Sequence, residues 1–322
     1  MDSEAVKSLP SLFRWLTLAA LADWLITRTL TRSAIFVPKS PPVITAYEAL
    51  GLIGQWAFTL TSLLALVAVG WMAFRLLRAR RGIVLPITLL GLLALSLLFV
   101  VIPPGGWLAV DYHLLVIAAA GLIGWGMWTR AGGGGRKIAW VFPALALLAG
   151  EALQLNQALF GAMRWPGPPP GAMTLFNLGE LFAVLSMVGL WWAYCWHPGQ
   201  DGIRPYVLAA LPALAFSAAH LINPAMTGIV AIWSTGLTLY LPWPVYAVSL
   251  WLAGVVVFAS LRRGDAVGWA VLLLAAGGYA PQLSTQVFLI LIALWLLSEE
   301  EGAPGLGYDI AVWAIGNRAS SL

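Results

Sequence analysis

The chain has very few charged residues. Asp, Glu, Lys and Arg make up 9% of its 322 residues, and 61% of the residues are hydrophobic, whereas soluble domains carry about 25% charged residues. This scarcity of charge excludes an ordinary soluble domain. The long apolar runs instead predict an all-α polytopic membrane protein in the lipid bilayer.

Cysteine is almost absent as well. Cys195 is the single cysteine, so an intramolecular disulfide and a cysteine-based metal cluster are excluded. A cleavable signal peptide is not expected, because the first apolar stretch carries Asp23 and Arg28 and lacks a small-residue cleavage site. The net charge of +4 does not indicate nucleic-acid binding, because the basic residues lie in short loops that orient a membrane chain.

Nine segments are long and apolar enough to cross a membrane, which takes about 20 residues. Their basic connections, such as Arg75 to Arg81, alternate with Pro- and Gly-rich connections. Because basic loops mark the cytoplasmic side, we expect a multi-pass protein of a prokaryotic cytoplasmic (inner) membrane, with its N-terminus in the cytoplasm and its C-terminus outside. The predicted spans are 10–30, 43–74, 83–102, 107–129, 138–163, 171–196, 203–222, 242–261 and 266–297.

The sequence also contains an internal repeat with an offset of about 128 residues. At this offset Asp23 aligns with Glu151, and Leu50-Gly51 aligns with Leu178-Gly179. Four spans in each copy would give both copies the same orientation, as parallel repeats around an axis along the membrane normal. Chance similarity among Leu- and Ala-rich helices is the alternative. Three prolines of each copy align too: Pro38, Pro41 and Pro42 with Pro166, Pro169 and Pro170.

The repeat divides the chain into three parts. Residues 1–131 form the first predicted four-span repeat, 137–263 the second, and 264–322 a ninth span with an extracytoplasmic tail. Residues 225–241 are an insertion in the second repeat and are apolar enough to span. A crossing there would place the basic pair after residue 261 outside, so we expect this insertion to be re-entrant or to lie at the outer surface.

Several ionisable residues lie in the outer half of the predicted spans, where a charge costs at least about 2.5–3.5 kcal/mol. Three interpretations remain open: side chains at helix ends that reach water or pair with arginine, a proton or cation site, and metal or haem ligation. Two histidines on different helices, His113 and His220, suit haem or metal ligation. The predicted proton or cation pathway comprises Asp23, Glu48, Asp111, Glu151 and Glu180.

Tryptophan is abundant, with 18 residues. Most tryptophans lie at predicted span ends, where their rings anchor the chain at the membrane interface. Four of them offer an alternative, a pocket for a flat ring such as a quinone or a pigment: Trp191, Trp192, Trp233 and Trp251.

The predicted ninth span is interrupted at its middle by Gly277, Gly278 and Pro281. One interpretation is a simple proline kink. The other is a broken helix, whose freed backbone groups line an ion or substrate site in many transporters.

The sequence predicts function only in outline. The repeated bundles, short loops, abundant tryptophan and outer acids favour a non-catalytic membrane subunit of an energy-transducing, electron-transfer or proton-translocating assembly. Other membrane protein subunits would be its partners, and it would offer a proton path or a quinone-sized pocket. The first alternative is a proton- or cation-coupled secondary transporter for a small solute, and the second is a haem- or metal-binding membrane enzyme. No catalytic residue is predicted.

Overall fold

The computed structural model describes residues 11–30, 39–79, 82–103, 105–130, 135–195, 202–222, 243–277 and 283–300. Every regular element among these residues is a helix, as the predicted all-α class requires. The elements are α1 (Ser11–Asp23), continued by the π-helical segment η1 (Trp24–Leu30), α2 (Pro41–Arg78), α3 (Val84–Val101), α4 (Gly106–Arg130), α5 (Gly135–Ala162), α6 (Ala172–Cys195), α7 (Arg204–Ile222), α9 (Trp243–Arg263), α10 (Val267–Gly277) and α11 (Leu283–Glu300).

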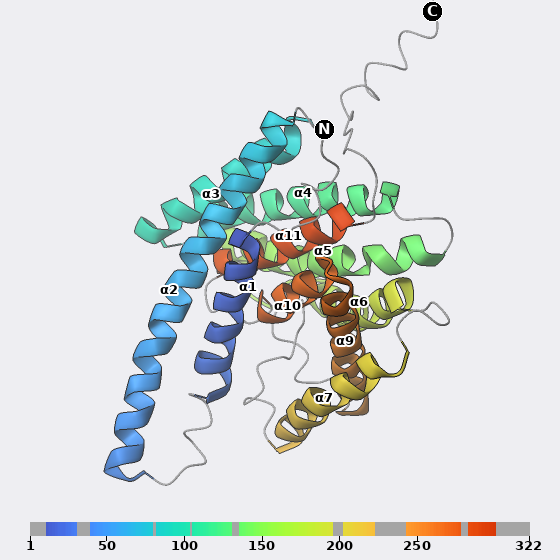
Figure 1. Cartoon of the computed structure of the whole chain (residues 1–322). Helices are drawn as coiled ribbons and strands as arrows, with labels where there is room; N and C mark the ends of the chain where they lie inside the picture. Colours follow the sequence, from blue (N-terminus) through green and yellow to red (C-terminus); the bar gives the residue numbers. More distant parts are fainter. Residues whose placement is uncertain are drawn as a thin grey trace, which may run out of the picture.

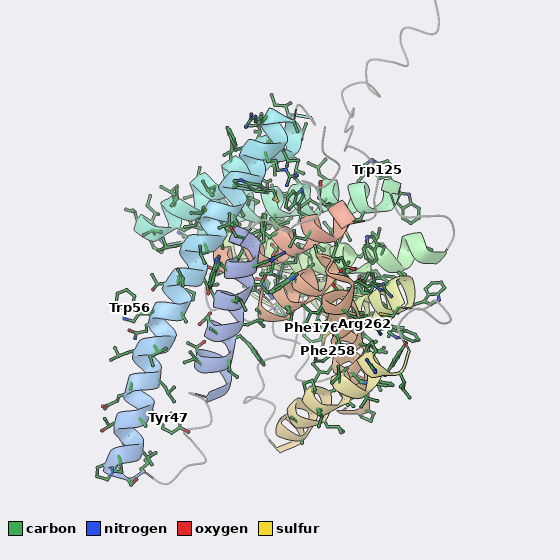
Figure 2. All side chains as sticks on the ribbon, in the orientation of Figure 1. Tyr47, Trp56, Trp125, Phe176, Phe258 and Arg262 are labelled. Carbon is green, nitrogen blue, oxygen red and sulfur yellow. The ribbon has the colours of Figure 1, made fainter. Side chains whose placement is uncertain are left out.

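Helices α2 to α6 are long and apolar enough to cross a membrane. Only 33% of the most apolar part of α2, and 28% of that of α3, is buried inside the molecule. Large apolar side chains such as Trp56, which is 75% exposed, therefore point away from the bundle (Figure 2). An outward apolar surface of this kind suits lipid, so the structure agrees with a membrane location.

Helix ends follow the local sequence. Pro41 and Pro42 open α2, where the missing proline N–H would have no helical partner. Helix α9 ends at Arg263. The next residue, Gly264, has a φ of +76° that favours glycine, and its N–H donates to the Ser260 carbonyl at 2.8 Å. This left-handed cap reverses the chain sharply between α9 and α10.

Most helices pack against their neighbours in the sequence: α1 on α2, α2 on α3, α3 on α4, α4 on α5, and α5 on α6. Helix α9 packs against α7 and α6, and α10 packs against α9, α11 and α1. Helices α10 and α11 lie in the middle of the molecule (Figure 1). Residues 287–297 of α11 are all buried, with at most 4% exposure, as expected for a helix that is apolar on every face.

The region of the predicted ninth span differs from one continuous crossing. The chain forms two helices there, α10 and α11, which pack against each other. Helix α10 ends at Gly277, the first residue of the predicted interruption, whereas Gly278 and Pro281 lie outside the described residues. The two four-span repeats remain a prediction, and so do the sides of the membrane. Residues 225–241, the predicted re-entrant insertion, also lie outside the described residues.

Candidate functional site

A histidine and a glutamate meet at the buried interface between α4 and α5. The Nδ1 atom of His113 lies 2.7 Å from the Oε2 atom of Glu151. His113 is 4% exposed and Glu151 is 2% exposed, so neither side chain is solvated by bulk water. An isolated charge is costly inside a protein, so a buried ionisable group needs a partner. His113 and Glu151 are partners of each other. A single proton can lie on the imidazole or on the carboxylate of this pair.

Two more buried polar groups lie beside the pair. The ring of Tyr112 meets the His113 ring edge-on, with centroids 5.6 Å apart, and the Tyr112 hydroxyl lies near Ser96 and Glu151. The hydroxyls of Tyr112 and Ser96 make no hydrogen bond of good geometry with any described residue. We call Ser96, Tyr112, His113 and Glu151 the polar cluster. It brings four groups that can donate or accept a proton to the junction of α3, α4 and α5.

The helix period explains why α4 presents two neighbouring residues to the cluster. Asp111 and Leu114 are exposed, whereas Tyr112 and His113, between them, are buried. Successive residues are about 100° apart around a helix, so the two inner residues share one face. Away from the polar cluster, small residues let α4 and α5 pack closely. A Cβ atom on Gly124 would lie only 3.0 Å from the Ala144 Cβ atom.

Asp23 is buried in a different interface. It is 4% exposed, and its Oδ1 atom accepts a hydrogen bond of 2.9 Å from the Thr27 hydroxyl, four residues later in η1. Thr27 in turn touches α2, because a Cβ atom on Gly54 would lie 2.6 Å from its Cγ2 atom. Helix α1 packs against α2 and α10, while α5 packs against α4, α6 and α11. Asp23 and Glu151 therefore belong to separate sites.

The other members of the predicted pathway are more scattered. Glu48 on α2 and Asp111 on α4 are exposed. Glu180 lies on α6 and His220 on α7, but their side chains are outside the described set. The structure thus joins one residue of the predicted acid pathway, Glu151, to one of the predicted haem or metal ligands, His113. Both were predicted to lie in the outer half of the membrane, but they were not predicted to pair.

No group of three His, Cys, Asp or Glu residues suited to a metal occurs within the described parts of the chain. The Nδ1 atom of His113 is engaged by Glu151, which leaves Nε2 as the ring nitrogen that a metal or haem iron would use. A carboxylate on the other nitrogen is the usual support for such a ligand.

Two of the four tryptophans of the predicted pocket contact Tyr206. Trp191 donates to the Tyr206 hydroxyl at 3.2 Å, and Trp251 donates to the Tyr206 carbonyl at 2.9 Å. The two rings therefore meet at Tyr206 where α6, α7 and α9 join. Trp192 is 41% exposed, and Trp233 lies outside the described residues.

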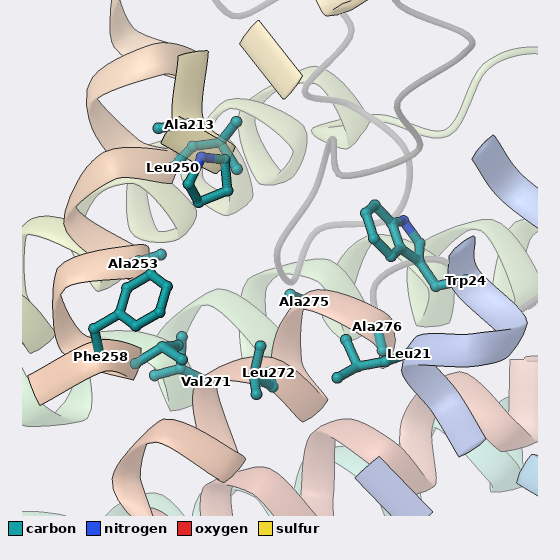
Figure 3. A pocket seen from close by; sticks show the side chains of 13 residues that line it. Leu21, Trp24, Ala213, Leu250, Ala253, Phe258, Val271, Leu272, Ala275 and Ala276 are labelled. Carbon is teal, nitrogen blue, oxygen red and sulfur yellow. The ribbon is translucent and has the colours of Figure 1, made fainter. Parts of the chain in front are cut away.

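An apolar pocket of about 250 Å³ lies elsewhere, between α1, α7, α9 and α10 (Figure 3). Leu21 approaches it from α1, Trp24 from η1, Phe258 from α9, and Val271 and Ala276 from α10. Its walls are almost wholly carbon. The pocket therefore suits a hydrocarbon chain better than the polar ring of a quinone, whose carbonyls need hydrogen-bond donors.

A second polar site, not predicted from the sequence, closes the turn between α9 and α10. The Asp265 carboxylate accepts hydrogen bonds from the hydroxyls of Tyr194 and Ser260, and from the Val267 N–H at 3.1 Å. The Arg263 guanidinium lies 4.3 Å from the centre of the Tyr194 ring. An aspartate just before a helix is a capping signal, so its local role could have been predicted, whereas its bond to α6 could not.

Comparison with known proteins gives no family to which the site can be referred. The chain matches no protein-family model, no curated protein and no solved structure.

Proposed function

We propose that the chain is a non-catalytic membrane subunit of an energy-transducing assembly and that it carries protons through the polar cluster. The observation that supports this proposal best is the buried contact of 2.7 Å between His113 and Glu151. Ionisable residues inside membrane helices are costly, and they commonly mark proton relays.

The chemistry of the pair suits proton exchange. A proton that moves from the imidazole to the carboxylate turns an ion pair into a neutral pair, without any change in the total charge of the buried site. The nearby hydroxyls of Tyr112 and Ser96 are further donors and acceptors toward α3. A relay of this kind needs no catalytic nucleophile and no bound metal.

The exposed surface of α2 and α3 supports the proposal that the chain is a subunit. Helices α2 and α3 expose many large apolar side chains, among them Trp56, Phe74 and Val101. Lipid covers such surfaces, and so do neighbouring membrane subunits, which pack through the same apolar contacts.

A secondary transporter is the second candidate, and the packing of α10 back against α11 favours it. Helices interrupted within the membrane line the substrate and ion sites of many transporters. In this chain α10 ends at Gly277, and its partner helix begins at Leu283. The two candidates differ in whether the chain acts alone.

Purification from native membranes in a mild detergent separates the two candidates. A subunit is expected to co-purify with other membrane proteins in fixed stoichiometry. A lone chain or a homodimer would instead favour the transporter.

The role of the pair is tested on the same purified particle, reconstituted into vesicles that contain a pH-sensitive dye. We expect Glu151→Gln to lower proton flux at least about tenfold, because it keeps the shape and the hydrogen bond but removes the titrating group. The matched control is Asp23→Asn, which alters a buried acid outside the polar cluster and should leave the flux within about twofold of the wild type. Wild-type flux in Glu151→Gln would refute the proton relay.

A further inference from the structure

We propose that α10 and α11 form a re-entrant hairpin, which enters the membrane from the side of the basic loops, turns near the middle and returns to the same side. The C-terminus would then share the side of the N-terminus. This inference replaces the expected ninth span and its extracytoplasmic tail. It does not depend on the proposed function.

Helix α11 runs in the same direction as α2. The hydroxyls of Ser62 on α2 and Thr285 on α11 lie 2.9 Å apart. Trp71 and Trp295, which come nine and ten residues later on the same two helices, have ring centres 6.2 Å apart. Two contacts that advance together along both helices show that α11 runs parallel to α2. Helix α2 runs toward the basic connection after Arg78, so α11 runs toward that end as well.

The last turns of α11 lie beside residues that are close to basic connections. The Trp295 ring lies 5.5 Å from the Phe13 ring near the start of α1, and the Arg75 guanidinium lies 5.8 Å from the Trp295 ring centre. The Trp140 indole, three residues after Lys137, donates to the Leu297 carbonyl at 3.2 Å. Three separate helices thus hold the end of α11 beside basic connections.

Helix α10 starts beside a basic connection. It follows the basic pair Arg262 and Arg263 and the capping Asp265, so it begins at the same end of the molecule. Helices α10 and α11 pack against each other, and a Cβ atom on Gly277 would lie 3.1 Å from the Leu289 Cβ atom. Glycine at this position therefore allows the close approach of the two arms of the hairpin.

The length of α10 fits half a bilayer. Helix α10 has 11 residues, which at about 1.5 Å per residue is roughly 16 Å, and the hydrocarbon core is about 30 Å thick. Helix α11 has 18 residues, or roughly 27 Å on the same measure, of which the part from Thr285 to Leu297 covers about 18 Å. Helix α10 by itself is therefore too short to reach the far side.

The surroundings of the hairpin also meet the requirements of the membrane. Interrupted backbone is tolerated at membrane depth only where protein or water surrounds it. Most residues of both arms are buried, and the arms contact α1, α2, α4, α5 and α9. The cation of Arg75 near the carbonyl end of α11 is favourable for the helix dipole.

The acidic tail does not oppose this topology. The predicted extracytoplasmic tail begins with Glu299, Glu300 and Glu301, but acidic residues contribute little to membrane orientation. The basic residues decide it, and the hairpin leaves all the basic connections on the side where they were predicted.

Cysteine labelling tests the hairpin in the full chain. In a Cys195→Ser background, single cysteines are introduced as Ser40→Cys in an outer loop, Ala131→Cys in an inner loop and Ser320→Cys near the C-terminus. Sealed right-side-out vesicles are then treated with a membrane-impermeant maleimide, before and after permeabilisation. We expect Ser320→Cys to follow Ala131→Cys and to react only after permeabilisation.

Reaction of Ser320→Cys in sealed vesicles, at the level of Ser40→Cys, would overturn the hairpin and restore the ninth span. A C-terminal fusion to green fluorescent protein gives an independent reading, because that protein fluoresces only when it folds in the cytoplasm. A dark C-terminal fusion beside an active alkaline phosphatase fusion at the same site would also overturn the inference.

Discussion

Asp23 and Glu151 align in the predicted repeat, yet they are buried in different ways. The Asp23 carboxylate accepts a hydrogen bond from within its own segment, from Thr27 four residues later. The Glu151 carboxylate is bonded across a helix interface, by His113, which lies 38 residues away. A local partner forms whenever the helix forms, whereas a distant partner depends on the packing of two helices. The comparison teaches that similar sequence positions predict where an acid is buried but not what stabilises it.

The largest expected effect comes from breaking the distant pair. His113→Leu leaves Glu151 buried without its described partner, and losing one member of a buried pair costs about 3–5 kcal/mol. The double variant His113→Leu with Glu151→Leu should recover most of that stability, because a matched apolar pair is often neutral. Thermal and denaturant unfolding of the purified protein in detergent measures both variants. A double variant as unstable as His113→Leu would show that the pair is not the stabilising unit.

A smaller effect is expected from crowding the local site. Gly54→Ala places a methyl group 2.6 Å from the Thr27 Cγ2 atom, so the side chain that holds Asp23 must move, and overpacking costs about 1–3 kcal/mol. Gly51→Ala lies one turn earlier on α2 and meets nothing within 4 Å, so it is the matched control. It should be neutral or slightly stabilising, since alanine favours helix by up to about 1 kcal/mol. Equal melting temperatures for the two variants would contradict the close contact.

The smallest effect is expected from Asp23→Asn. The amide oxygen of asparagine can still accept the hydrogen bond from Thr27, so the loss should be about 1 kcal/mol or less. Equilibrium unfolding compared with the wild type measures it. A loss as large as that of His113→Leu would mean that Asp23 takes part in a network as strong as the polar cluster, and the contrast between the two acids would fail.

Much of the candidate site was within reach of the sequence, but its pairing was not. Glu151 and His113 could each be recognised from the sequence, because each is an ionisable residue in an apolar run, where a charge is costly. Tyr112 and Ser96 gave no such signal, since single hydroxyls are common in membrane helices. Helical periodicity alone does not say which face of α4 meets which face of α5, and that choice creates the polar cluster.

The class of the protein follows from its amino-acid composition. Long apolar runs with scarce charge allow only elements that satisfy their own backbone, and the structure has helices in those runs. The packing of α10 back against α11 at the centre of the molecule could be learned from the folded chain alone. An apolar run of this length carries no signal for direction, because lipid and protein interior are equally apolar. The direction came from contacts between distant residues, such as Ser62 with Thr285 and Trp140 with Leu297.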